Sequence, residues 1–226
     1  MASPRICVVV TARNDAEAID TIRRTRLFLP DLIEIRLDYM ETLGDLGLIR
    51  EVTDVPLIAT NRRPNQGGKP AGSEADRIAG LLRACESGFN YVDLEIDIEG
   101  VEELAEKIKS LGAGVIISFH DFETTPEKER LEEILRDELS AGADICKIVG
   151  TSNTPGDNLA YFNLLLDNAD VEIVSFGMGI AGVLSRVLSP LVGGAFTYAS
   201  AEMGSESAPG QLTISELREI YRMMGA

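Results

Sequence analysis

The sequence predicts a single (β/α)8 barrel that spans residues 1–226. Apolar, β-branched segments recur eight times along the chain, at intervals of about 23–35 residues, and each interval has room for one amphipathic helix. No Pro- or Ser-rich linker divides the chain into separate parts. Strands and helices that alternate in this number are typical of a closed parallel barrel.

Each predicted strand is a short run rich in Val, Ile, Leu or aromatic residues. In chain order these runs are 6–11, 32–37, 56–60, 91–96, 114–119, 144–149, 171–176 and 194–198. Helix boundaries carry signals of their own: Gly112 suits a helix end, and Thr125-Pro126 before Glu127 predicts a cap with proline in the first turn.

An open doubly wound sheet is the alternative architecture. Such sheets usually carry a G-x-G-x-x-G turn after the first strand, whereas residues 11–14 read Thr-Ala-Arg-Asn. The missing glycines favour the barrel.

Composition excludes several classes of protein. A hydrophobic content of 45% with 26% charged residues is ordinary for a globular chain and excludes disorder and fibrous repeats. No apolar run approaches the roughly 18 residues that would cross a membrane, and the N-terminal apolar stretch is interpreted as a strand, not an export signal. The net charge of −16 disfavours nucleic acid and anionic membranes as partners. An anionic substrate must therefore be attracted by a local group of arginines.

The cysteines and the histidine are few. Cys7, Cys85 and Cys146 are far apart and odd in number, which disfavours a disulfide framework and favours a reducing cytoplasm. His120 is the only histidine, so a structural zinc site is not expected.

Polar residues occupy inward strand positions near the carboxyl ends of the predicted strands, where barrel enzymes place their chemistry. Such residues are Glu34, Arg36 and Asp38 on one strand, Asp93 and Glu95 on another, Arg62 and His120 after two more, and Lys147 within the sixth. Each alone has an ordinary structural explanation, such as a barrel salt bridge.

Lys147 is the strongest indication of catalysis. A lysine is almost never buried in an apolar strand without a partner or a purpose. Burial favours the neutral amine, which is a nucleophile for a carbonyl carbon. We therefore expect Lys147 and His120 to meet at one barrel mouth as catalytic residues.

Five segments, in order along the chain, resemble the type I 3-dehydroquinate dehydratases. They are Glu34-Ile35-Arg36-Leu37-Asp38, Ser118-Phe119-His120-Asp121-Phe122, Lys147-Ile148, Ser185-Arg186 and Ser207-Ala208-Pro209-Gly210-Gln211. The resemblance implies a (β/α)8 barrel that needs no cofactor and is usually a homodimer. No metal is expected, and the cysteines already favour the cytoplasm. It also implies dehydration of 3-dehydroquinate to 3-dehydroshikimate, in the shikimate pathway, through a Schiff base on Lys147 with His120 as acid and base.

The same resemblance assigns the substrate contacts. Arg186 is expected to bind the substrate carboxylate, and Met178 with Phe176 to form an apolar wall. The ring hydroxyls are assigned to Glu34, Arg36, Arg62, Ser207 and Gln211. Residues 199–211 resemble a lid that orders over bound substrate.

One position departs from the family pattern. Gln66 stands where the family commonly has a glutamate, and an amide can orient His120 but cannot raise its basicity as a carboxylate does. Asp93 or Glu95 is a candidate for the missing charge.

Two other functions remain open from the sequence. A class I Schiff-base aldolase would also use a barrel lysine, with Gly193-Gly194 imitating a phosphate loop. A non-catalytic protein that binds a quinate-like acid is suggested by Gln66 alone.

Overall fold

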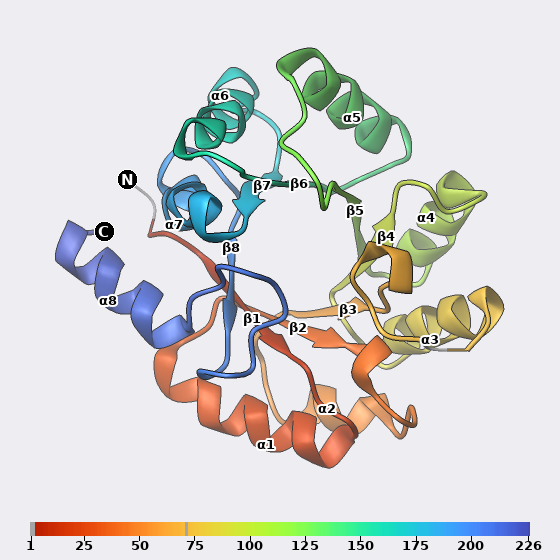
Figure 1. The fold of residues 1–226 in the computed structure, drawn as a ribbon. Coiled ribbons are helices and arrows are strands. Elements are labelled where there is room, and N and C mark those ends of the chain that lie inside the picture. The colour runs from red at the N-terminus through yellow and green to blue at the C-terminus, as the bar shows by residue number, and fades with distance from the viewer. Residues whose placement is uncertain (1–2, 71) are drawn as a thin grey trace.

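In a computed structural model, which describes residues 3–70 and 72–226, the chain forms eight parallel strands surrounded by helices (Figure 1). The strands are β1 Ile6–Val10, β2 Leu32–Arg36, β3 Leu57–Thr60, β4 Tyr91–Glu95, β5 Gly114–His120, β6 Ile145–Thr151, β7 Ile173–Met178 and β8 Thr197–Ser200. The α-helices are α1 Asp15–Thr25, α2 Leu46–Glu51, α3 Glu74–Glu86, α4 Val101–Ser110, α5 Lys128–Ser140, α6 Asn158–Asp167, α7 Val183–Leu188 and α8 Ile214–Met224.

The sheet curls into a nearly closed barrel. Its strand order is β7-β6-β5-β4-β3-β2-β1-β8, so the first strand pairs with both the second and the last. At the closing seam, the backbone N–H of Ala195, just before β8, donates to the carbonyl of Ile173 in β7 at 2.8 Å. The predicted (β/α)8 barrel is confirmed, and an open doubly wound sheet is excluded.

Two apolar layers hold the barrel together. Inside it, Cys7, Ile58 and Ile116 belong to one buried cluster. Between strands and helices lie others, which include Ile35 beside Ala18 of α1 and Cys146 beside Leu135 of α5. Because alternate residues of a strand point to opposite sides, one strand serves both layers. Cys146 faces outward and Lys147 inward, as expected.

Several predicted strand boundaries are off by one or two residues, and two boundaries are wrong for a clear physical reason. The last strand begins at Thr197 and not at 194, because the N–H of Gly194 is bonded to Ser189 in a turn and pairing with β1 starts only at Thr197. Helix α5 begins at Lys128 with Glu127 as its cap. Thr125 does not cap it, since its hydroxyl donates to the carbonyl of Thr151.

Other local signals act as expected. Helix α4 ends at Ser110, and Gly112 follows it with a φ of 88°, which favours glycine. Helix α8 begins with a capping box, in which Thr213 and Glu216 satisfy one another's backbone N–H groups. No helix among the described residues is long and apolar enough to cross a membrane.

Candidate active site

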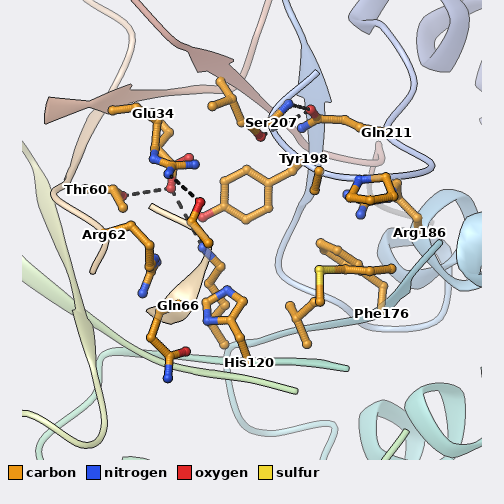
Figure 2. Close-up of a pocket in the computed structure, with 18 of the residues that line it drawn as sticks. Glu34, Thr60, Arg62, Gln66, His120, Phe176, Arg186, Tyr198, Ser207 and Gln211 are labelled. Atoms are coloured by element: carbon orange, nitrogen blue, oxygen red, sulfur yellow. Dashed lines mark hydrogen bonds and ion pairs between the residues drawn. The ribbon is translucent and has the colours of Figure 1, made fainter. Parts of the chain in front are cut away.

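A cavity of about 230 Å³ opens at the carboxyl ends of the barrel strands. Figure 2 shows side chains from the strands and from the loop before α8 converging on it. Of the predicted site residues, it is lined by Glu34, Arg36, Arg62, Gln66, His120, Lys147, Met178, Arg186, Ser207 and Gln211. Asp93 and Glu95 lie behind this lining.

Lys147 is the buried amine of the site. It is only 6% exposed, on β6, and its Nζ donates to Oδ2 of Asp93 at 2.8 Å. A second carboxylate oxygen, Oε1 of Glu34, lies 3.7 Å from Nζ. Two carboxylates therefore compensate a charge that would otherwise be costly to bury.

Asp93 connects the lysine to a wider ionic network. Its Oδ1 lies 2.7 Å from Nη2 of Arg62, and it accepts a hydrogen bond from the hydroxyl of Ser118. Burial by itself would raise the pKa of Asp93, but the charges of Arg62 and Lys147 outweigh it and hold that pKa well below its usual range. Asp93 is thus a carboxylate at every working pH.

Glu95 points away from the catalytic residues. Its Oε2 lies 2.9 Å from Nη1 of Arg77, and its Oε1 accepts the backbone N–H of Arg63. Oε1 also lies 3.5 Å from Nη1 of Arg62. The carboxylate therefore orients Arg62 and the start of the loop after β3, and it does not hydrogen-bond His120.

His120 ends β5 at the cavity wall. Its ring stacks on Phe122 at 6.0 Å between centroids, and its Nδ1 is buried without a hydrogen-bond partner among the described residues. Burial, with the positive charges of Arg62 and Lys147, lowers the pKa of His120 well below its ordinary value. The imidazole is therefore neutral at pH 7 and able to accept a proton.

Gln66 lies in a short helix, Pro64–Gln66, and lines the same cavity. Figure 2 places its amide on the side of the cavity where His120 lies. The orphan Nδ1 of His120 shows that the expected orienting hydrogen bond from Gln66 to this atom is absent. Asp93 is the carboxylate that influences His120. Its negative charge favours the imidazolium and partly offsets the lowering of the His120 pKa.

Arg186 is a buried cation that has no ion-pair partner in the described part of the chain. It lies on α7 and is 1% exposed, and neither Nε nor Nη2 has a hydrogen-bond partner among the described residues. Its guanidinium packs over Phe176, with 4.3 Å from Cζ to the ring centroid. Burial lowers its pKa to about 10. A buried guanidinium with free donors indicates a site built for an anion.

The loop between β8 and α8 closes the other side of the cavity. In Figure 1 it crosses the barrel mouth in front of β8. Gln211 accepts the backbone N–H of Ser207 at 2.7 Å, while its Nε2 is buried and unpaired within the described part of the chain. Gly210 has a φ of 76°, and a Cβ there would lie 2.5 Å from the carbonyl oxygen of Gly179. Residues 199 and 200, expected in the lid, belong to β8 instead.

Arg36 is held in place by Asp38, which lies two residues further along the chain. Its Nε and Nη2 donate to the two oxygens of Asp38, each at 2.8 Å. Asp38 itself lies in a short helix, Leu37–Tyr39, because β2 ends at Arg36.

Three further polar or aromatic residues line the cavity without a role assigned from the sequence. Thr60 donates to Oε1 of Glu34 at 2.8 Å, Phe122 stacks on His120, and Tyr198 packs against Lys147. Tyr198 lies inside the predicted strand 194–198, so strand alternation could have placed its side chain in the barrel interior. Among the described residues, no group of three or more His, Cys, Asp or Glu side chains could hold a metal ion.

Comparison with known proteins gives a consistent result. A family model described as Type I 3-dehydroquinase matches residues 6–226. A 3-dehydroquinate dehydratase of Dehalococcoides mccartyi is 36% identical over 223 residues, covering 98% of this chain and 96% of the relative.

Solved structures of the same class are also similar. The 3-dehydroquinate dehydratase of Geobacillus kaustophilus superposes with a TM-score of 0.91 at 26% identity, over 98% of this chain and 91% of that one. The type I enzyme of Clostridium difficile, with covalently modified comenic acid, gives 0.87 at 27% identity, over 99% and 93%.

Proposed function

Because the chain belongs to the type I 3-dehydroquinase family, we propose that it dehydrates 3-dehydroquinate to 3-dehydroshikimate through a Schiff base on Lys147. The observation that carries this proposal is that three reactive groups line one cavity. The amine of Lys147, the neutral imidazole of His120 and the unpaired guanidinium of Arg186 all line it.

The first stage is formation of the iminium ion. The ammonium group of Lys147 transfers a proton to His120, and the resulting amine attacks the C3 ketone. The electron pair of the C=O bond moves to oxygen, which takes a proton from nitrogen and then leaves as water with the proton held by His120. The positive charge remains on the nitrogen, where Asp93 and Glu34 compensate it.

The second stage is elimination of water from C1 and C2. His120 removes a proton from C2, and the electrons of that C–H bond flow into the iminium nitrogen. The electrons return to expel the C1 hydroxyl, which takes the proton from His120 and departs as water. Hydrolysis of the conjugated iminium then releases the enone product and regenerates Lys147.

Binding of the substrate follows from its charge and hydroxyl groups. Arg186 binds the carboxylate, since its free donors suit a bidentate pair and the net charge of −16 would otherwise repel an anion. Glu34, Arg36, Ser207 and Gln211 line the cavity with groups that can bind ring hydroxyls. Arg62 uses its donors on Asp93 and Ser118, so its main role is to keep Asp93 in place beneath the lysine.

The decisive experiment is borohydride reduction in the presence of 3-dehydroquinate, followed by peptide mass analysis. The reduced adduct should form on Lys147, and Lys147→Ala should abolish both the adduct and turnover. Lys109→Ala is the matched control, because that exposed lysine pairs with Asp144 outside the cavity. An adduct centred on another lysine would refute the assignment. Absorbance of the enone product separates dehydration from retro-aldol cleavage and from binding without turnover.

We further propose that the protein acts as a homodimer, as the family resemblance implies, and that it acts in the cytoplasm. All three cysteines are free and buried, which is compatible with a reducing compartment. Sedimentation equilibrium at micromolar concentration should give a mass close to twice 24.5 kDa.

A further inference from the structure

Tyr198 presents a buried hydroxyl group that no described residue satisfies. Its side chain faces the barrel interior from β8, is 4% exposed, and lines the cavity. Its hydroxyl has no hydrogen-bond partner among the described residues. Leaving a buried donor unpaired costs about 1–3 kcal/mol, so phenylalanine would fill this space at lower cost. Such a group is expected to have a partner in another state of the protein.

The ring of Tyr198 is held firmly next to the reacting lysine. It packs edge-on against Phe176 and Phe196, with centroid separations of 6.3 and 5.3 Å. Nζ of Lys147 lies 4.4 Å from the ring centroid, and Figure 2 shows the ring in the middle of the lining residues. Burial, followed by the nearby charge of Glu34, raises the pKa of Tyr198 well above its ordinary value. The hydroxyl therefore keeps its proton and can act only as a neutral donor or acceptor.

We propose that the Tyr198 hydroxyl donates a hydrogen bond to the oxygen of the substrate ketone while Lys147 attacks it and until that oxygen leaves as water. This inference rests on the proposed Schiff-base function. Once the N–C bond has formed, the oxygen lies two covalent bonds from Nζ, and Nζ is already packed on the ring of Tyr198. The ketone oxygen is thus a hydrogen-bond acceptor that forms within reach of the unpaired Tyr198 hydroxyl.

The ring and the hydroxyl have separable contributions. The ring face attracts the positive nitrogen both as an ammonium and as an iminium ion, so it does not favour one over the other. The hydroxyl acts on the oxygen as negative charge develops there, and it transfers no proton. The protons of the leaving water come from the lysine nitrogen, one of them through His120, as in the proposed mechanism.

Tyr198→Phe tests the hydroxyl alone. Loss of one donor to a developing oxyanion typically costs about 10²–10³ in rate, so rapid-quench borohydride trapping should show adduct formation slowed by that factor. Iminium formation then limits turnover, and the isotope effect from C2-deuterated substrate should fall towards one. The melting temperature of the free protein should equal or exceed that of the parent, because an unsatisfied group has been removed. Tyr221→Phe is the control, since its buried hydroxyl bonds to Val187 at 2.7 Å and lies outside the cavity.

Failure of this inference and failure of the proposed function give different results. If the parent forms no adduct on Lys147, the proposed function is wrong. If the parent forms it and Tyr198→Phe forms it at the same rate, only the role of Tyr198 is wrong. A lower melting temperature with unchanged trapping would indicate a merely structural hydroxyl and also overturn the inference.

Discussion

Replacement of Arg186 by methionine should weaken substrate binding and, at the same time, stabilise the free protein. Arg186 is 1% exposed and has free donors, and its pKa is lowered by burial to about 10. The lowered pKa means that burial of the charged guanidinium costs about 3 kcal/mol of folding free energy. The whole cost applies at pH 7, because Arg186 is then protonated in both the native and the unfolded state. Methionine removes the charge and can still pack on Phe176.

The magnitudes follow from these contacts. A stability gain of at most about 3 kcal/mol would raise the melting temperature by several degrees, since roughly 2–4 °C accompanies each kcal/mol in a chain of this size. Loss of a desolvated carboxylate partner costs about 2–5 kcal/mol, which is roughly a 30- to 4,000-fold loss in kcat/KM, mostly through KM.

Calorimetry of the free proteins and initial rates of enone formation check both parts. Arg77→Met is the matched control, because Arg77 is also buried but is paired with Glu74 and Glu95. That variant should lose stability, since it leaves the buried carboxylate of Glu95 without this partner. Arg186→Met with a lower melting temperature and an unchanged KM would refute the reasoning and make Arg186 a structural residue.

Two further predictions concern the histidine and its neighbour. His120→Ala should fold and lose about 10²–10⁴ in turnover, and more than about a tenth of parental activity would require another base. In the parent, kcat/KM should fall only as pH drops well below the ordinary histidine value, because burial and nearby cations favour the neutral form, and this limb should vanish in the variant. Gln66→Glu should retain activity and raise the pKa of His120, as NMR titration can measure, because a nearby anion favours imidazolium. An unchanged pKa with unchanged turnover would place residue 66 outside the catalytic environment.

The barrel itself and the inward direction of Lys147 were predictable from local pattern. Strand alternation separates Cys146 from Lys147 whatever surrounds them, and eight apolar segments with room for helices leave few other arrangements. The same alternation put Glu34 and Arg36 at the barrel mouth. The five motifs also identified the family without any structure.

Pairing between distant residues was not predictable in this way. Asp93 and Glu95 share one face of β4, yet one lies beneath Lys147 and the other turns to Arg77, because helix α3 brings an arginine to only one of them. Tyr198 lies within the predicted last strand, but two features around it were not predictable from local pattern. These are the late start of β8, which follows a turn at Ser189 and Gly194, and the packing of the Tyr198 ring against Lys147. The chain specifies which groups face inward through local geometry. Whether a buried polar group finds a partner depends instead on contacts between segments far apart in the sequence, and among the described residues Arg186 and the Tyr198 hydroxyl find none.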